Sequence, residues 1–323
     1  MLLDQTYLQL LLGKKNLLAF SGGVDSTALF FLLLEKGIDF DIAIVDYNLR
    51  EQSKEEVSYA KELAKKYNKQ LFLKEVTLPD SNFEANARKE RYGFFDTIIK
   101  EHSYQNLLTA HQLDDKLEWF FMQLSKGAGV VELLGLQPKE EKNGYKIIRP
   151  LLQITKDELL NYLHDNNIMY FIDHTNKDTK YKRNHIRQNY TKEFLKSYKS
   201  GVKKSFDYLQ NDYNELLKVE ILSNQKDLYI LKNQNNDLLN IRAIDKIVKK
   251  LGLLLSKSTK DEILKQKEII LSNKVVVAFT DEKIYISPHS NTILPKEFKE
   301  KCRVLKIPPK IRPYIFSQSL LIE

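Results

Sequence analysis

The sequence predicts an α/β fold: a doubly wound, mostly parallel sheet, followed by a linker helix and a smaller C-terminal α/β domain. Over roughly the first 190 residues, short apolar strands alternate with helices, which is the pattern of a parallel sheet. From about residue 201 the chain changes to lysine-rich helices, asparagine-rich turns and a hairpin. Because 323 residues suffice for two cores, we divide the chain into residues 1–200 and residues 201–323.

The elements of the first domain follow in chain order. Strands are predicted at residues 16–20, 40–45, 71–76 and 106–110, and helices at residues 27–34, 53–67, 82–100 and 155–166. A glycine-containing stretch at 126–136 and a polar stretch at 138–146 interrupt the alternation. Ligands of such sheets bind at the carboxyl ends of the strands. Since Ser21, Asp46 and His111 each follow a predicted strand, we expect the site there.

The composition limits the class of protein. Cys302 is the single cysteine, which excludes an intrachain disulfide and any CxxC metal or redox site. The apolar runs are shorter than the ~20 residues that cross a bilayer, and the N-terminus does not have the pattern of a signal peptide. We therefore expect a cytoplasmic protein with no membrane partner. The net charge of +8 favours polyanionic partners, although a solvated lysine surface would give the same total.

The most specific motif is the SGGVDS string at residues 21–26, between a strand and a helix. Adjacent glycines let backbone amides approach an anion, and a helix N-terminus adds unpaired N–H groups and partial positive charge. Unlike the P-loop, the string has no lysine and instead places Asp25 among the phosphates. It predicts a nucleotide-binding loop, with Asp25 as a candidate Mg²⁺ ligand. A simple capped helix start is the alternative.

A second cluster follows the strand at 106–110. If the helix starts at His111, then His111, Asp115 and Glu118 share one face. That face could bind a metal, ATP or a cationic substrate. The alternative is that Asp114 and Asp115 only favour the positive end of a solvated helix.

Arginine is rare, at nine residues against 42 lysines, so it should mark positions that need a planar, bidentate fork. Arg88 and Arg91 share a helical face with Glu84, and an ion pair of Glu84 with Arg88 would leave Arg91 for a phosphate. Arg183 and Arg187 stand four residues apart, after a polar segment at 173–181. Chance placement or structural ion pairs are the alternative for some of these arginines, and an ordinary capped helix with basic residues is the alternative for the segment that carries Arg183 and Arg187.

Together these segments resemble the tRNA(Ile)-lysidine synthetase family of the ATP pyrophosphatases, in order over roughly the first 190 residues. The blocks are SGGVDS at 21–26, VDYNLR at 45–50, ExxARxxRY at 84–92, HQLDDKLE at 111–118, KGAG at 126–129 and the segment 173–187. The family patterns for the second and fourth blocks are VDHGLR and HHxxDQxE, for the fifth RGxG and for the sixth DxSNxDxxYxRNxIR. This sequence departs from them at Tyr47, Asn48, Gln112, Lys116, Lys126 and Thr175.

The resemblance implies an adenine nucleotide alpha hydrolase-like fold and a two-step ligation on a CAU-anticodon isoleucine tRNA. ATP adenylates the C2 oxygen of the wobble cytidine, and free L-lysine then displaces AMP. The product, lysidine, changes decoding from AUG to AUA. The resemblance also implies that the lysine-rich second domain binds the tRNA body. A homodimer is compatible with the sequence.

Residue roles follow from the resemblance and from the chemistry of the substrates. ATP is expected on Ser21, Gly22, Gly23, Val24, Asp25, Ser26 and His111, with Mg²⁺ on Asp25. Free lysine carries one carboxylate and two ammonium groups, so its pocket needs a guanidinium group and carboxylates. We assign the guanidinium group to Arg183 and the carboxylates to Asp115 and Glu118. Asp25, Asp115 and Arg183 are the expected catalytic residues. Contacts to tRNA or phosphate are assigned to Arg88, Arg91 and Arg187. Candidate base-stacking residues are Tyr47, Tyr92 and Trp119, of which Trp119 is expected in the core instead.

Two other hypotheses remain open at this point. A tRNA thiolase or an NAD synthetase would share the loop, although a thiolase with paired cysteines conflicts with the single Cys302 and an NAD synthetase leaves the basic second domain unexplained. A non-catalytic RNA-binding relative is the other, and the complete loop with Asp25 and Ser26 argues against it.

Overall fold

A computed structural model describes residues 3–48, 51–79, 81–142, 144–172, 182–216 and 219–320. They form two compact units, Met1–Gln210 and Asn211–Glu323, which we describe separately. Arg50 and residues 173–181, which belong to two of the motif blocks, lie outside the described residues.

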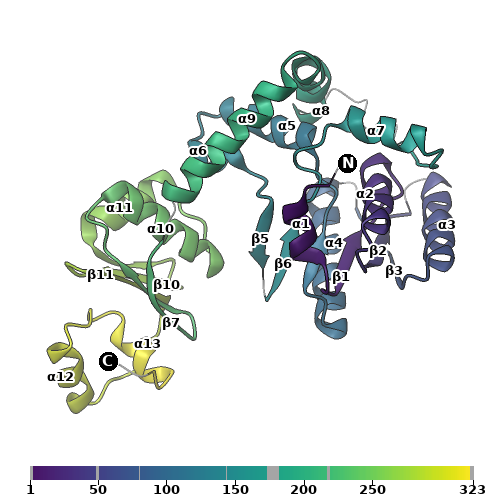
Figure 1. Ribbon diagram of the computed structural model, residues 1–323. Coiled ribbons are helices and arrows are strands. Elements are labelled where there is room, and N and C mark those ends of the chain that lie inside the picture. The colour runs from purple at the N-terminus through teal and green to yellow at the C-terminus, as the bar shows by residue number, and fades with distance from the viewer. Residues whose placement is uncertain are drawn as a thin grey trace. The chain divides into compact units, whose positions relative to one another are not determined.

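The first unit is built on a six-stranded sheet with the strand order β3-β2-β1-β4-β6-β5 (Figure 1). The strands are β1 Asn16–Ala19, β2 Asp41–Asp46, β3 Leu71–Glu75, β4 Asn106–Leu108, β5 Lys139–Lys142 and β6 Tyr145–Ile148. The first four and β6 pair in parallel, while β5 pairs with β6 in antiparallel fashion. The predicted mostly parallel sheet is confirmed. The polar stretch at 138–146 does not interrupt it but adds the edge strand β5, whose charged residues suit an unpaired edge.

Helices cover both faces of this sheet. The helical elements that begin in this unit are α1 Gln5–Leu11, α2 Val24–Glu35, α3 Glu51–Lys66, α4 Phe83–His102, α5 Leu113–Leu124, α6 Val130–Leu134, α7 Lys156–Asp165, α8 Lys182–Ile186, the π-helical turn η2 Arg187–Thr191 and α9 Lys192–Leu216. Neighbouring strand residues point to opposite faces. Leu18 therefore packs in a core with Phe30 of α2, and Leu17 packs in another with Phe95 of α4. The doubly wound arrangement is confirmed.

The sheet reverses its winding between β1 and β4. Strands β2 and β3 lie on one side of β1, and β4 and β6 lie on the other. In open α/β sheets, ligands bind in the crevice outside the strand ends at such a switch point. The segment that contains Ser21 follows β1, and the segment that begins at Thr109 follows β4. Both segments therefore lie at this crevice.

The second unit contains a five-stranded antiparallel sheet with the order β7-β8-β11-β10-β9. Its strands are β7 Ile221–Gln225, β8 Leu228–Lys232, β9 Glu268–Leu271, β10 Val275–Phe279 and β11 Lys283–Pro288, and its helices are α10 Asp237–Lys250, α11 Lys257–Gln266, α12 Lys296–Val304 and α13 Arg312–Ser317. Val277 packs with Ile244 of α10, whereas Val276 packs with Ile315 of α13. The sheet is thus covered on both faces, as an α/β domain requires.

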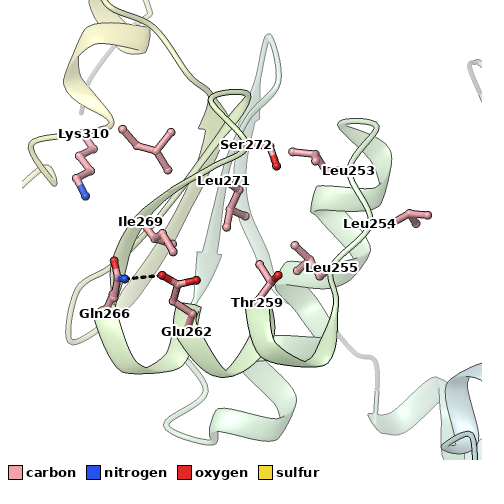
Figure 2. Close-up of a pocket in the computed structure, with 11 residues that line it drawn as sticks. Leu253, Leu254, Leu255, Thr259, Glu262, Gln266, Ile269, Leu271, Ser272 and Lys310 are labelled. Atoms are coloured by element: carbon pink, nitrogen blue, oxygen red, sulfur yellow. Dashed lines mark hydrogen bonds between the residues drawn. The ribbon is translucent and has the colours of Figure 1, made fainter.

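A cavity of about 510 Å³ lies in this second unit (Figure 2). Leucines from the segment after α10 line it together with α11 and β9, and the Gln266 amide donates to Glu262 at 2.7 Å across its wall. All site residues predicted from the sequence have lower numbers than Asn211, where this unit begins. The cavity therefore adds nothing to the expected chemistry.

Trp119 was expected in the core, and that expectation is wrong. Its side chain is exposed, and its Nε1 donates to the Glu132 carbonyl at 2.8 Å. The ring lies against Gly135, where a Cβ atom would come within 2.1 Å of the indole. Gly135 also has φ +52°, a backbone conformation that favours glycine. The indole thus packs on backbone rather than in the core.

We predict that Gly135→Ala costs roughly 2 kcal/mol of stability or more, because both the ring and the backbone must shift. Gly127→Ala is the control, since Gly127 has φ +73° but no atom of the described residues within 4 Å of its Cβ, and it should cost about 1 kcal/mol of strain. Trp119 is the single tryptophan, so urea unfolding followed by its emission measures both. Equal stability of the two variants would contradict the packing.

Candidate active site

The turn between β1 and α2 is fixed by backbone conformation and by hydrogen bonds within the chain. Gly22 has φ +72°, and its carbonyl accepts from the Phe171 N–H at 3.0 Å. The Ser26 hydroxyl donates to the Gly23 carbonyl at 3.2 Å and accepts from the Ser21 N–H at 3.2 Å. Gly23 is the N-cap of α2, and no side chain of the described residues caps it. The alternative of a simple side-chain-capped helix start is therefore wrong, and the first amides of α2 are available to an anion.

Asp25 lies in the first turn of α2 and is poorly satisfied. Its side chain is 26% exposed, yet its Oδ1 is buried and accepts no hydrogen bond from the described residues. Its Oδ2 lies 4.0 Å from the Lys156 ammonium. Burial raises the pKa of Asp25 to about 7, with Lys156 opposing and Asp115 adding to the shift. The carboxylate thus lies in the first turn of α2, and one of its oxygens accepts no hydrogen bond from the described residues.

Helix α5 begins later than predicted. It starts at Leu113, with Gln112 as N-cap: the Gln112 side chain accepts from the Asp114 N–H, and Asp115 Oδ2 accepts from the Gln112 N–H at 3.2 Å. His111 therefore precedes the helix, and the shared helical face of His111 with Asp115 and Glu118 is wrong. Asp115 and Glu118 do share a face, because they are three residues apart within the helix.

His111 lies at the end of the β4 segment, with its Nδ1 3.0 Å from the Thr109 hydroxyl. Burial, together with the positive charges of Arg149, Arg183, Arg88 and Arg91, lowers the pKa of His111 to about 3. Its imidazole is therefore neutral near pH 7. The same arginines create positive potential at this edge of the sheet, which attracts phosphate groups.

Four charged side chains form what we call the charged seam, between α5 and the segment α8–η2: Asp115, Glu118, Arg183 and Arg187. Arg183 donates to Glu118 at 2.8 Å and to Asp115 at 2.6 Å. Arg187 donates to Glu118 twice, at 2.6 and 3.0 Å. The acids predicted for the ammonium groups of lysine and the fork predicted for its carboxylate are therefore already in contact with one another.

The local helix geometry explains why both arginines reach the seam. Arg183 lies in α8, and Arg187 opens the π-helical turn η2, in which the Lys192 N–H donates to the Arg187 carbonyl. A π turn is rare and often occurs at functional sites. Arg187 was predicted to contact tRNA or phosphate, and it lies in the charged seam, where it donates to Glu118.

The predicted RNA contacts Arg88 and Arg91 are exposed on α4. The described residues hold no ion pair between Glu84 and Arg88; the Arg88 guanidinium lies over the Tyr92 ring at 4.6 Å instead. Both Arg88 and Tyr92 line a cavity of about 380 Å³ that also includes Lys142 and Arg149. Lys142 and Lys156 were not among the predicted site residues, because with 42 lysines in the chain no single lysine stands out.

Comparison with known proteins first defines the class. A family model described as a PP-loop domain matches residues 3–194. A solved U34-tRNA thiolase from Methanococcus maripaludis, which contains a [4Fe-4S] cluster, superposes with a TM-score of 0.50 at 17% identity, covering 61% of this chain and 73% of that chain. At this identity the likeness shows the fold alone. The loop after β1 and the domain match together define a PP-loop protein.

Curated relatives narrow the class. The tRNA(Ile)-lysidine synthase of Wolinella succinogenes is 44% identical over 303 residues, covering 94% of this chain and 93% of the relative. Those of Campylobacter jejuni (strain RM1221) and Helicobacter pylori (strain 26695) are 42% and 41% identical, each covering 98% of this chain and 97% or 94% of the relative. The chain belongs to the tRNA(Ile)-lysidine synthase family. The family predicted from the motif blocks, and with it an ATP-using enzyme, is confirmed.

The described residues contain no helix long and apolar enough to cross a membrane.

One buried charge beside the site is a departure from the family pattern. Lys116 of α5 is 2% exposed, and its ammonium lies over the Phe206 ring of α9 at 4.5 Å. It forms no ion pair within the described residues. Burial lowers the pKa of Lys116 from the ordinary 10.5 to about 8. The folded protein therefore binds the proton of the Lys116 ammonium less tightly than the unfolded chain does.

We predict that Lys116→Met raises stability at pH 7 by about 1–3 kcal/mol, the pKa shift less the lost cation–π contact. Below pH 8 both states are charged and the wild type carries the full cost. Between pH 8 and 10.5 the unfolded state binds more protons, so wild-type stability rises and the difference shrinks. Urea unfolding at pH 7 and pH 10 measures this, with Lys100→Met on the exposed face of α4 as control. A constant difference between the two pH values would contradict it.

Proposed function

We propose that this chain converts the wobble cytidine of a CAU-anticodon isoleucine tRNA to lysidine, using ATP and free L-lysine at the strand-end site of the first unit. The observation that carries the proposal is the proximity of a phosphate-binding loop to the charged seam. Lys156 lies between them: its ammonium is 4.0 Å from Asp25 Oδ2 in the loop, and its N–H donates to Asp114 of α5, next to Asp115 of the seam, at 3.0 Å. Asp115 and Arg187 of the seam also influence the pKa of Asp25. Two chemically different subsites, one for phosphates and one for a zwitterion, therefore adjoin.

In the first step the loop holds ATP by its phosphates. The amides of residues Gly22 to Ser26 and the hydroxyl of Ser21 face the β- and γ-phosphates, while the Ser26 hydroxyl, which donates to the Gly23 carbonyl, holds the shape of the turn. The C2 oxygen of cytidine attacks the α-phosphorus; the new P–O bond forms as the α–β bridge breaks and pyrophosphate leaves. Neutral His111 donates to a phosphate or to adenine without bringing a charge. The fixed donors of the loop stabilise the charge that develops on pyrophosphate.

Mg²⁺ fits the residues around Asp25. The Oδ1 atom of Asp25 is buried and accepts no hydrogen bond from the described residues, and Mg²⁺ typically takes one or two carboxylates together with substrate phosphates. The described residues hold no group of three or more candidate metal-ligating side chains, so Asp25 is the protein ligand we assign. When bound, the ion offsets charge on the leaving pyrophosphate. By binding the ion, Asp25 would keep the positive charge of the ion next to the loop.

In the second step lysine enters the charged seam by exchanging partners with it. The Arg183 side chain is 47% exposed whereas that of Glu118 is 1% exposed. Arg183 can therefore turn to the carboxylate of lysine while Glu118 keeps Arg187 in place. Asp115, released from Arg183, then accepts from an ammonium group of lysine. The uncharged ε-amine attacks C2 of the adenylated base, the C2–N bond forms, and AMP leaves with the oxygen.

The remaining contacts concern the tRNA. Arg88 and Arg91, exposed on α4, bind phosphates of the anticodon arm, and the second unit binds the tRNA body. A cytoplasmic location and a homodimer are part of the same proposal. Gel filtration with light scattering tests the dimer, with a mass near twice 37.9 kDa expected.

We predict that the purified protein incorporates labelled lysine into a CAU-anticodon isoleucine tRNA with ATP and Mg²⁺, releasing one AMP and one pyrophosphate per lysine. The methionine tRNA with the same anticodon should accept little or none, and it is the matched control. Transfer of sulfur or ammonia in place of lysine would contradict the proposal.

A second prediction separates the two subsites. Asp25→Ala should abolish tRNA-dependent pyrophosphate release, because the loop loses its carboxylate. Asp115→Ala should retain pyrophosphate release but raise the KM for lysine at least tenfold. Malachite green detection after pyrophosphatase treatment measures the first step, and lysine titration measures the second. If both variants lose pyrophosphate release equally, the division of roles is wrong.

A further inference from the structure

Beyond the charged seam, α5 and α9 carry a row of aromatic rings at the surface. Phe121 of α5 packs edge-on against Phe194 of α9 with 5.7 Å between ring centroids, and Phe194 lies 5.1 Å from Tyr198. We call Phe121, Phe194 and Tyr198 the aromatic row. Phe194 is 40% exposed and Tyr198 is 61% exposed. Large apolar side chains gathered at a surface mark a binding site more often than scattered ones do.

The core of the first unit does not need these two exposed rings. The buried face of α9 is formed by Leu195, Val202 and Phe206, and Phe206 contacts Phe120 of α5 at 5.7 Å. Phe194 and Tyr198 lie four residues apart on another face, and they share one patch for that reason. At Tyr198 the backbone leaves helical geometry, with φ −128° and ψ 20°. The buried face of α9 therefore holds the helix in place without Phe194 and Tyr198.

The aromatic row follows the charged seam along α5 and along the chain from η2 into α9. Phe121 lies three residues after Glu118 in α5, so the two are one turn apart. Phe194 lies seven residues after Arg187, a rise of about 10 Å. A nucleotide whose base is at the seam thus has its neighbours in reach of the rings.

The charges around the row select a polyanion as the ligand. Between residues 182 and 204 the chain carries eight basic side chains and one acid, Glu193. Four of the basic side chains are ion-paired: Arg183 and Arg187 with the acids of the seam, and Lys199 and Lys203 with Glu158 of α7. The other four, which form no ion pair within the described residues, are Lys182, Lys192, Lys196 and Lys204, and they still outnumber Glu193. Single-stranded RNA is bound by aromatic rings on which unpaired bases stack, with cations along the backbone. A hydrophobic protein partner would not require this excess of positive charge.

We propose that the aromatic row is the stacking platform for the unpaired bases that flank the modified cytidine. This proposal rests on the proposed function and adds the RNA contact to it. Phe194 and Tyr198 each stack on a base, while Phe121 supports Phe194 from below. The target base is thereby held out of the loop, beside the charged seam.

The test uses an anticodon stem-loop RNA with 2-aminopurine next to the target cytidine, because stacking on a ring quenches its fluorescence. Wild-type protein should quench it on binding. Phe194→Ala and Tyr198→Ala should lose the quenching and bind the RNA roughly five- to a hundredfold more weakly. Tyr198→Phe keeps the ring and should behave as wild type. Tyr208→Ala, exposed on the same helix but outside the row, is the matched control.

Several outcomes would overturn the platform. These are unchanged quenching in the two alanine variants, an equal loss in Tyr208→Ala, or a change from dimer to monomer with RNA affinity unaffected. Thermal midpoints exclude unfolding as the cause of a loss. Lysine incorporation by the wild type is measured in parallel. If the wild type incorporates lysine and the alanine variants do so with an unchanged KM for tRNA, the stacking platform is wrong but the proposed function stands. If quenching depends on the aromatic row but the wild type incorporates no lysine, the proposed function is wrong but the platform stands.

Discussion

Glu118 is a buried carboxylate, and its burial is tolerable only because two arginines donate to both of its oxygens. This contact fastens α8 and η2 to α5. It fixes where Arg183 and Asp115 face each other, and it sets the register in which the aromatic row follows one turn further on. Removing the carboxylate would leave two arginines with Asp115 as the one remaining acid of the seam, so the geometry of this side of the site depends on Glu118.

The two halves of the site are prepared in opposite ways. In the loop, the start of α2 has no side-chain cap and Asp25 Oδ1 accepts no hydrogen bond from the described residues, and burial raises the pKa of Asp25. We propose that the nucleotide and its ion supply these missing contacts. The charged seam satisfies its own groups before lysine arrives. A zwitterion can replace each contact with one of the same kind, which makes the exchange selective for a ligand with both charges. We assign His111, which is neutral in the field of four arginines, to the proposed phosphate subsite.

Much of this was predictable from local sequence. Alternating strands gave the sheet, and the spacing of Asp115, Glu118, Arg183 and Arg187 gave two helical faces, though not that they meet. The failures come from contacts that are distant or compete locally. Gln112 caps α5 and excludes His111 from it. The charged residues of β5 form a strand because β6 pairs with them. Trp119 finds a partner in the backbone of Gly135. The Arg88 guanidinium lies over the Tyr92 ring instead of forming an ion pair with Glu84.

The central claim is that Arg183 exchanges its acids for the carboxylate of lysine. The most direct measurement compares kcat/KM for lysine and for lysine amide, which lacks that carboxylate, in wild type and Arg183→Gln. We expect the wild type to prefer lysine at least tenfold, and the variant to lose this preference because only the lysine reaction slows. If the variant still prefers lysine as strongly as the wild type does, Arg183 does not bind the carboxylate.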